Sequence, residues 1–417
     1  AEKNRWGYFS SFSAGWRLSQ EDFFSKSNNP FISDLKIRAG WGIVGNDNIP
    51  AYSRYGLVDT ISYKYLVGGG AQTAFVPQSL ENSDLKWEKT SQFDIGIDLS
   101  LLRNRISLTA DYYNKKTTDM LLAVPIPTST GFSIAWQNAG SIENKGFEFT
   151  LSTKNIVSST VKWNTDFNIS FNRNKVLNIV GTTLAVGGIN PAGDDFYTAL
   201  VQEGKPLGSF YGKISQGVDP ATGNIKFLQT KNNSSDSIGI IGNANPKFMY
   251  GLSNSISYGN FTLDIFFQGV YGNQILNATR ILTESMSLVM NQSATVVDRW
   301  KNPGDVTTIP KVTPSDWSNS NPSTRYLESG SYLRLKSLTI GYNLPKTVIS
   351  KMKMSRFMVY ATGENLLTFT KYSGFDPEVS AFSARAQSKT NQNTAPGVDF
   401  GTYPQSRDFI LGVNITF

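Results

Sequence analysis

The C-terminal stretch of the chain decides how the rest is interpreted, and it reads Arg407-Asp408-Phe409-Ile410-Leu411-Gly412-Val413-Asn414-Ile415-Thr416-Phe417. Successive side chains of a β-strand point to opposite faces. From Phe409 to Phe417 the odd positions are all apolar, whereas the even positions are mostly small or polar. A soluble edge strand of this kind exposes an apolar ladder that promotes aggregation, but a strand between lipid and a wet lumen does not. This pattern alone leaves two alternatives open, a wall strand of a closed barrel and the last strand of a β-sandwich.

Composition favours a large β-protein. The chain has 417 residues, of which 39% are hydrophobic, 17% charged and 12% aromatic. That length exceeds an ordinary soluble domain, although one large barrel uses all of it. No stretch approaches the ~18 consecutive apolar residues of a transmembrane helix, which excludes a helical membrane protein and leaves a barrel open. Aromatic rings in this number suit girdles at a membrane interface or sugar-stacking surfaces.

Two absent residue types exclude most catalytic chemistry. The chain has no Cys and no His, which excludes disulfides, thiolate metal sites, imidazole bases and His-ligated zinc. The net charge of +7 is scattered along the chain, whereas a nucleic-acid binder usually gathers its charge on one face. We therefore expect no catalytic residue, no cofactor, no metal site and no nucleic-acid partner. The N-terminus lacks an apolar signal segment and takes up strand pattern almost at once, which predicts that the sequence begins partway through a domain.

A hairpin over residues 93–113 separates the barrel from the sandwich. Apolar side chains at 93, 95, 97 and 99 alternate with polar ones, and Asp94, Asp98 and Asp111 all fall on the face opposite the apolar stripe. Burying such carboxylates in a soluble core costs several kcal/mol unless they are paired. Facing a water-filled lumen, they cost little, so the hairpin favours a transmembrane antiparallel β-barrel.

The predicted connections alternate in length. Those near 102–104, 156–159, 259–260 and 344–354 are short, and those at 45–85, 175–245, 273–330 and 365–405 are long. A transmembrane barrel has short periplasmic turns and longer extracellular loops, whereas a sandwich has no reason to sort its loops. We also expect a β-bulge near Lys336-Ser337, where the alternation changes phase, and partial helix within 275–299. Whether 208–229 spans the wall or forms an extracellular hairpin, with Ser209–Ile214 paired to Gly223–Phe227, stays open.

The long loops carry the candidate contact residues. Their aromatic side chains suit stacking on a sugar or packing against a partner, and ordinary loop packing is the alternative; the candidates are Tyr52, Tyr55, Trp136 and Trp317. The segment from Asp219 to Asp236 invites a calcium-loop interpretation. It lacks the alternating acids and closing Glu of such a loop, so we do not predict a metal there.

A series of short motifs, taken in order, resembles a known family. The resemblance covers nearly the whole chain, and its motifs include Ser33–Arg38, Leu85–Thr90, Ala110–Tyr113, Asn138–Glu148, Glu203–Pro206, Asn245–Lys247, Phe266–Gly269, Arg299-Trp300, Gly363–Leu367, Gly374–Glu378 and Gly401–Pro404. Together these segments resemble the C-terminal barrel portion of SusC/RagA-type TonB-dependent outer-membrane transporters of Bacteroidota. One departure is visible, because Lys231–Ser237 replaces the Asp-rich loop of many relatives and puts any ion at that loop in doubt.

The resemblance implies a 22-stranded barrel in the cell outer membrane, of which residues 1–417 supply about the second half. The plug and the TonB-contacting segment would lie outside this chain. The implied function is TonB-dependent import of a nutrient, an oligosaccharide or a peptide, together with a SusD-like surface lipoprotein. Other implied partners are the TonB complex, reached through the missing N-terminal part, and outer-membrane lipid and lipopolysaccharide.

Other functions remain open from sequence. They are a passive porin or structural outer-membrane barrel, and a secreted carbohydrate-binding β-protein. The barrel interpretation makes one further prediction. The strand that ends at Phe417 should pair with the first strand of the barrel, which the sequence does not contain, so residues 1–417 alone should leave the sheet open.

Overall fold

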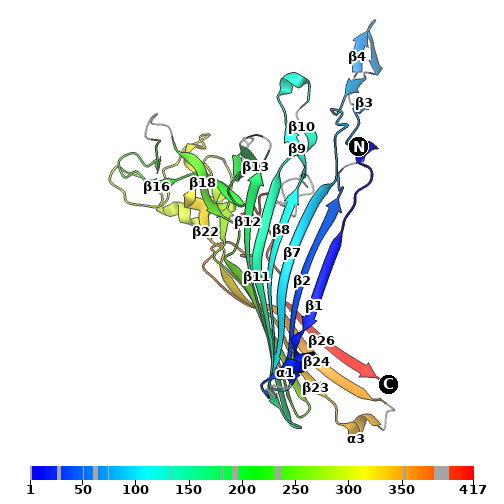
Figure 1. Ribbon diagram of the computed structural model, residues 1–417. Coiled ribbons are helices and arrows are strands. Elements are labelled where there is room, and N and C mark those ends of the chain that lie inside the picture. Colours follow the sequence, from blue (N-terminus) through cyan, green and yellow to red (C-terminus); the bar gives the residue numbers. More distant parts are fainter. Residues whose placement is uncertain are drawn as a thin grey trace.

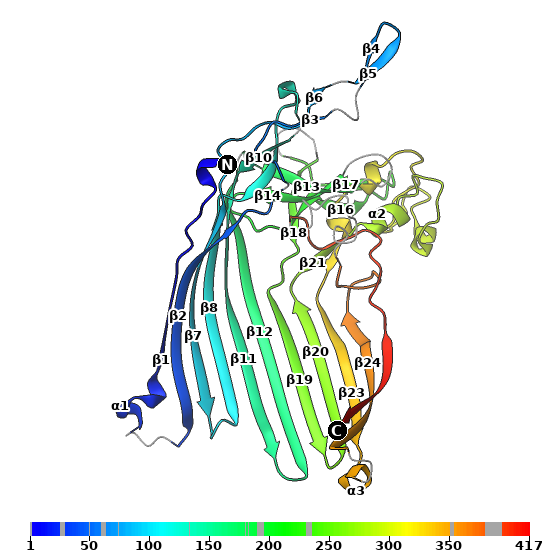
Figure 2. The same cartoon turned by 90° about the vertical axis from the view of Figure 1, so that its right-hand side faces the viewer.

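A single long antiparallel sheet dominates the computed structural model (Figures 1 and 2). The structure describes residues 2–25, 30–49, 51–59, 64–73, 75–132, 134–179, 181, 183–189, 196–230, 236–350, 354–379 and 394–417. The sheet has 11 strands, each hydrogen-bonded to the next along this series. In sheet order they are β1 (Ser11–Arg17), β2 (Ile32–Asn46), β7 (Glu88–Leu101), β8 (Ile106–Thr118), β11 (Ser141–Val157), β12 (Val161–Asn178), β19 (Phe248–Tyr258), β20 (Phe261–Tyr271), β23 (Tyr332–Asn343), β24 (Arg356–Thr370) and β26 (Asp408–Thr416).

The sheet is open at both edges. β1 and β26 end the strand order, and among the described residues neither pairs with a second neighbour in this sheet. Figure 2 shows the strands side by side between these two edges, with β26 running down to the C-terminus. The expected all-β wall is thus confirmed, and eleven strands match the expected half of a 22-stranded barrel. The missing strands that would close it stay a prediction.

Long and short connections lie at opposite ends of the sheet. The turns after β7, β11, β19 and β23 lie at the lower end in Figures 1 and 2, together with the connection that follows β1. The connections at 47–87, 119–140, 179–247, 272–331 and 371–407 gather at the upper end. This sorting confirms the expected arrangement of barrel turns and loops.

Strand register gives the sheet one apolar face and one polar face. One row of cross-strand partners is apolar on every strand from β2 to β24: Leu35, Leu99, Leu108, Leu151, Phe167, Leu252, Phe267, Leu335 and Leu367. The next row points to the other face and contains Lys36, Asp98, Thr109, Thr150, Asn168, Gly251, Gln268, Arg334 and Thr368. Because cross-strand neighbours lie on the same face, the alternation seen in each strand becomes continuous across the wall.

A glycine lets an ion-pair cluster form on the polar face. Arg38 Nη2 lies 2.7 Å from Asp111 Oδ1, and Arg38 Nε lies 3.3 Å from Asp98 Oδ2. Gly96 stands between Arg38 and Asp111 in the register. A Cβ atom there would come within 3.0 Å of both charged groups. Any larger residue would therefore push the arginine away from its acid.

The phase change in β23 is a β-bulge, as predicted. The pairing of β23 with β20 shifts between Phe266 and Phe267, and its pairing with β24 shifts between Leu335 and Ser337. Lys336 is the extra residue in the ladder with β20, whereas in the ladder with β24 the extra residue lies on β24, where Asn365 and Leu366 stand opposite Lys336. Since one unmatched residue reverses the face of everything beyond it, the bulge keeps Leu338 and Leu335 on the same apolar face.

The long connections carry their own small sheets. The larger ones are a four-stranded sheet of β13 (Thr183–Ile189), β14 (Phe196–Gln202), β15 (Ser209–Lys213) and β18 (Ile238–Asn243), and a three-stranded sheet of β22 (Leu327–Ser329), β21 (Gln274–Asn277) and β25 (Val398–Asp399). The two-stranded sheets are β3 (Val58–Asp59) with β6 (Val76–Pro77), β4 (Lys64–Val67) with β5 (Gly70–Thr73), β9 (Leu121–Pro125) with β10 (Ile134–Asn138), and β16 (Ser215–Val218) with β17 (Ile225–Phe227).

Helices are short and few. The α-helices are α1 (Asp22–Ser25), α2 (Thr279–Thr283) and α3 (Lys346–Ile349), and the 3₁₀ turns are Glu2–Asn4, Leu18–Gln20, Thr128–Thr130, Ala294–Asp298, Ser318–Ser320 and Thr324–Tyr326. Two of these elements fall within 275–299, where partial helix was expected. None of the helices in the described part of the chain is long and apolar enough to cross a bilayer.

The open question about 208–229 is answered by the small sheets. β15, β16 and β17 belong to sheets separate from the 11-stranded wall, so this segment does not span it. The expected pairing was wrong in part, because β17 pairs with β16 while β15 pairs with β14 and β18. Gly208 precedes β15 and Gly217 lies within β16 at its register shift, and both adopt a positive φ that glycine accepts readily.

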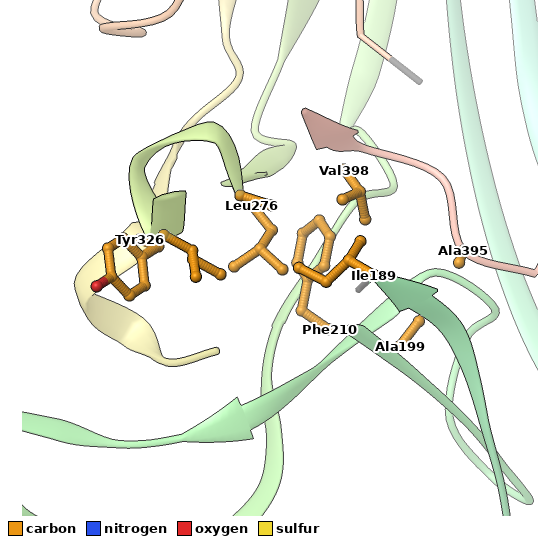
Figure 3. Packing of buried hydrophobic residues seen from close by; sticks show 9 residues of the cluster. Ile189, Ala199, Phe210, Leu276, Tyr326, Ala395 and Val398 are labelled. Carbon is orange, nitrogen blue, oxygen red and sulfur yellow. The ribbon is translucent and has the colours of Figure 1, made fainter. Parts of the chain in front are cut away.

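A hydrophobic core inside the loop layer holds three of the connections together (Figure 3). It joins Ile189, Ala199 and Phe210 from 179–247 with Leu276, Ala278, Ile281 and Tyr326 from 272–331 and Ala395 and Val398 from 371–407. Burying one such large side chain contributes about 1.5–3 kcal/mol. The three connections therefore form one packed layer above the sheet.

The two faces of the wall predict opposite responses to a charge. We expect Leu151→Arg to lower the free energy of unfolding in lipid bilayers by about 2–4 kcal/mol, because the arginine would enter hydrocarbon. The control is Thr150→Arg, one residue away on the polar face, for which we expect little change. Guanidinium unfolding of the whole protein in vesicles measures both, and equal losses would contradict the assignment of the faces.

Candidate ligand-contact sites in the loop layer

Two of the four predicted aromatic residues share one cavity. Tyr52 and Tyr55 line a cavity of about 380 Å³ between the 47–87 connection, the N-terminal segment and the start of β9. Arg5, Asp47 and Trp87 line it as well. The cavity thus combines aromatic faces with charged groups, which is the usual make-up of a site for a polar organic ligand.

The tyrosines are displayed by a strained turn. Tyr52 has a φ of 67°, a left-handed conformation that is costly for a bulky residue and is often found at functional sites. Its side chain is 69% exposed and that of Tyr55 is 43% exposed, and the two ring centroids lie 6.4 Å apart. The Arg54 guanidinium lies 4.2 Å from the centroid of the Tyr55 ring, a cation–π contact. Both rings therefore remain accessible to solvent, Tyr52 more than Tyr55.

Backbone hydrogen bonds fix this turn. The Tyr55 N–H donates to the Tyr52 carbonyl at 2.9 Å, and the Asn82 N–H donates to the Arg54 carbonyl at 3.0 Å. The Ser79 hydroxyl donates to the Tyr55 carbonyl at 2.9 Å. Ser53, between the tyrosine and the arginine, is buried. The backbone of the turn is therefore fixed by hydrogen bonds, while its two tyrosine rings remain exposed to solvent.

Trp136 and Trp317 are placed differently. Trp136 lies half-buried on β10, where its carbonyl accepts a hydrogen bond from Asn82 Nδ2 at 2.8 Å, so it adjoins the tyrosine turn without lining the cavity. Trp317 packs against the core of the loop layer. The structure brings Tyr52 and Tyr55 together, ties Trp136 to the same connection through its backbone, and leaves Trp317 in a separate packing role.

A second cavity was missed from the sequence. It has a volume of about 540 Å³ at the top of the wall, and its lining includes Asn273, Tyr332, Glu378, Thr402 and Tyr403. The Tyr403 ring is 90% exposed. Asn273 Oδ1 and Thr402 Oγ1 are buried without a hydrogen-bond partner. The segments Gly374–Glu378 and Gly401–Pro404, which belong to the family resemblance, were the available signal, but only the fold places them together.

A buried arginine holds one of these segments against the polar face. The Arg334 side chain is 2% exposed, with its Nη2 2.6 Å from Asp376 Oδ1 and its Nη1 2.5 Å from Glu378 Oε2. The Tyr332 hydroxyl donates to Glu378 Oε1 at 2.7 Å, and Arg334 Nε donates to Thr368 Oγ1 at 3.0 Å. Since Arg334 belongs to the polar row, the segment 374–378 folds inward over that face.

A second polar network joins the loop layer to the end of β24. Arg280 binds Glu328 at 2.9 Å, and the Ser373 N–H donates to Glu328 Oε2 at 2.9 Å. Burial raises the pKa of Glu328, but the hydrogen bonds from Ser373 and Arg280 outweigh it, so the pKa lies below its ordinary value. Burial, followed by the hydrogen bond to Asp399, raises the pKa of Tyr372, which keeps its hydroxyl protonated as the donor to Asp399 Oδ2 at 2.6 Å.

In the segment from Asp219 to Asp236, protein groups bind the Asp219 carboxylate. Asp219 accepts hydrogen bonds from the Ala221 N–H at 3.0 Å and from Thr222 Oγ1 at 3.2 Å, and Lys226 Nζ lies 3.5 Å away. The Ala221 N–H is the main cause of its lowered pKa. Residues Lys231–Ser235 lie outside the described residues. Across the described part of the chain, no group of three or more acidic residues is arranged to hold a metal ion.

Comparisons with known proteins agree with this architecture. The family model for the TonB-dependent receptor-like β-barrel matches residues 1–366. TonB-dependent receptor P3 of Formosa agariphila is 34% identical over all of this chain and 42% of its own length. TonB-dependent receptor SusC of Bacteroides thetaiotaomicron is 30% identical over all of this chain and 41% of its own length. The chain therefore spans less than half the length of the curated relatives it matches.

A solved structure shares the fold closely. The structure of the RagAB peptide transporter covers 100% of this chain with a TM-score of 0.82 and 25% sequence identity, and the chain covers 44% of it. In its closed-closed state, the RagAB peptide importer gives the same TM-score with 26% identity and the same coverage.

The Arg334 cluster makes a prediction about loop anchoring. We expect Arg334→Met to lower the free energy of unfolding by about 3–5 kcal/mol, because it leaves the buried Asp376 carboxylate without its cation and removes the nearer of the two cations beside the half-buried Glu378. Hydrogen exchange should rise at 374–378 in particular. The control is Arg17→Met, since Arg17 pairs with Asp34 but is 58% exposed, and we expect little change in stability there. Unchanged exchange at 374–378 in Arg334→Met would contradict the anchoring role.

The Glu328 network makes a prediction about pH. A carboxyl whose pKa is lowered in the folded protein contributes stability above its ordinary pKa and loses it as the pH falls. We therefore expect protection of the Ser373 amide from hydrogen exchange to fall as the pH drops below the ordinary Glu value of 4.5. In Glu328→Gln this extra loss should disappear. A wild-type protein with the same low-pH profile as the variant would refute the link.

Proposed function

The chain belongs to the TonB-dependent receptor-like β-barrel family of outer-membrane proteins, and on this premise we propose that it forms wall and ligand-contacting loops of a nutrient importer. In this proposal the ligand is an oligosaccharide or a peptide, captured at the loop end of the barrel. A SusD-like lipoprotein covers that end. The TonB complex supplies energy through a part of the protein outside residues 1–417, and outer-membrane lipid and lipopolysaccharide surround the wall.

One observation carries the proposal: the long connections gather at a single end of the wall, where three of them form a packed layer and the 47–87 connection exposes the Tyr52–Tyr55 pair at a cavity. A passive pore needs only a lumen, whereas an importer needs a surface that holds its ligand before passage. Tyrosine rings, a guanidinium and nearby amide groups suit noncovalent capture of a sugar or a peptide chain. The likeness to the SusC receptor and to the RagAB peptide transporter supports the same proposal of an importer.

The loop anchors support capture rather than covalent chemistry. The carboxylates of Asp376 and Glu378 are engaged by Arg334, and Asp376 Oδ2 also accepts the Gln405 N–H at 3.1 Å. Glu378 therefore lines the second cavity, and Asp376 helps to hold its segment in place. Tyr403 and Thr402, which lie in the same connection, add aromatic and polar groups to the lining of that cavity.

The test is uptake by cells that carry the whole receptor. The probes are fluorescent maltooligosaccharides and a labelled tryptic digest of casein, measured with and without a functional TonB complex. We expect uptake of one probe class that requires TonB, and a fall of about tenfold in Tyr52→Ala/Tyr55→Ala, since about 0.7 kcal/mol of stacking per ring, within the usual range of about 0.5–1.5 kcal/mol, adds to about 1.4 kcal/mol for the pair.

The matched control is Tyr52→Phe/Tyr55→Phe, which keeps both rings and should retain most of the uptake. A SusD-like lipoprotein should co-purify with wild type and with this control. Uptake that persists without TonB would favour a passive porin and overturn the import proposal. Full uptake by the alanine variant would remove the tyrosine pair from the ligand site and leave the importer itself standing.

A further inference from the structure

Four basic side chains lie together on the apolar side of the wall, near the loop end. They are Lys116 on β8, Lys145 on β11, and Arg173 and Lys175 on β12, called here the rim cations. Lys145 is the register partner of Arg173, and Glu143 is the partner of both Lys116 and Lys175. Since these residues alternate in phase with Tyr112, Phe147 and Phe171, all four share the outward face. All four side chains are exposed.

The apolar part of β12 fixes the height of the rim cations in the membrane, and it ends at an aromatic belt made of Tyr112, Phe147, Phe171, Phe248 and Tyr271. Along β12 the outward face is apolar or uncharged from Trp163 to Phe171, about 27 Å along the strand at ~3.3 Å per residue. With a strand tilt of about 40° this becomes about 20 Å, close to the apolar band of a barrel. Arg173 and Lys175 are the next two outward residues beyond Phe171.

The belt continues across neighbouring strands. The ring centroids of Tyr112 and Phe147 lie 5.1 Å apart, those of Phe171 and Phe248 lie 5.8 Å apart, and those of Phe248 and Tyr271 lie 5.0 Å apart. Aromatic girdles of this kind mark the boundary between hydrocarbon and headgroups. The rim cations are therefore at the level of the headgroups on the loop side.

At the turn end, the outward-facing positions of the same three strands are apolar. The outermost of them are Ile106 on β8, Ile156 on β11 and Val161 on β12. Two cations near that end, Arg103 and Arg105, lie in the turn between β7 and β8 and not on an outward strand position. Basic residues therefore occupy the outward strand positions of β8, β11 and β12 at the loop end.

Protein carboxylates do not neutralise the patch. Glu143 Oε2 lies 3.3 Å from Lys145 Nζ. Glu143 is also the register partner of Lys116 and Lys175. Within the described ranges, Lys116, Arg173 and Lys175 have no carboxylate within 4.0 Å. Four cations and one carboxylate leave three positive charges in excess on a surface that borders lipid.

We propose that the rim cations bind the phosphate groups of an anionic glycolipid headgroup in the outer leaflet. A guanidinium binds phosphate through paired hydrogen bonds, and lysines add point charges. The strands are ~4.8 Å apart, so the patch spans about 10 Å from β8 to β12, enough for one headgroup. The binding is lateral and structural, and it does not depend on which nutrient the receptor imports.

The experiment uses the whole receptor extracted in mild detergent and titrated with lipid A or with dephosphorylated lipid A. We expect wild type to bind lipid A and to bind the dephosphorylated form far more weakly. K116Q/K145Q/R173Q/K175Q should bind lipid A more weakly by about fivefold for each charge removed, from the usual gain of a basic residue at an anionic membrane surface. Native mass spectrometry counts the bound lipid.

The matched control is Lys115→Gln, because Lys115 is exposed and adjacent to Lys116 but points to the polar face; it should bind as wild type does. A variant with arginine at 116, 145 and 175 should retain binding, which separates loss of charge from loss of fold. Equal binding of the two lipid forms, or wild-type binding by the quadruple variant, would overturn the proposal. Full displacement of lipid A by millimolar inorganic phosphate would also overturn it, since the site would then hold a free anion.

Discussion

The backbone hydrogen bond is the interaction on which the rest of this structure depends. Inside hydrocarbon no water can satisfy an N–H or C=O group, so the chain must pair each strand with a neighbour. Here eleven strands do so in one antiparallel ladder, with only local bulges. Pairing in register then forces the side chains into rows. The apolar row through Leu151 and the polar row through Thr150 differ by a single residue, so register alone separates lipid from lumen.

The loops lie outside the hydrocarbon and are free of that constraint, so their structure depends on side-chain packing instead. At the loop end the connections can bury side chains against one another, and Phe210, Leu276 and Val398 meet in one core although they come from three connections. Arg334 links this layer to the wall, because its guanidinium stands in the polar row while its carboxylate partners belong to the last connection. The wall thus serves as a rigid base for this packed layer, while the separate 47–87 connection holds the strained Tyr52 exposed at the same end.

The two faces of the same strands support separate interactions. Inward, Gly96 gives Arg38 access to Asp111, and the inward-folded 374–378 segment forms the edge of a cavity. Outward, the same alternation carries Arg173 and Lys175 just past the aromatic belt, where headgroups begin. Lys115 and Lys116 are neighbours in sequence, but Lys115 faces the lumen and Lys116 faces the lipid. Residue parity, rather than distance along the chain, therefore decides which partner a charged side chain can meet.

The sequence by itself determined the wall. Alternation is a local property, so the stretch ending at Phe417, the hairpin around Asp98 and the phase change at Lys336 predicted strands, faces and a bulge that the structure confirms. The sorting of long and short connections followed from the same strands. The contacts within the loops could not be predicted in this way, because they join residues far apart in the chain and follow no periodic pattern. Only the tertiary structure paired β17 with β16, packed Trp317 against the loop core, set Tyr52 beside Tyr55 over a cavity, and brought Glu378 to Arg334. A strand is specified by its own pattern, whereas a site made of loops depends on long-range packing that no local pattern encodes.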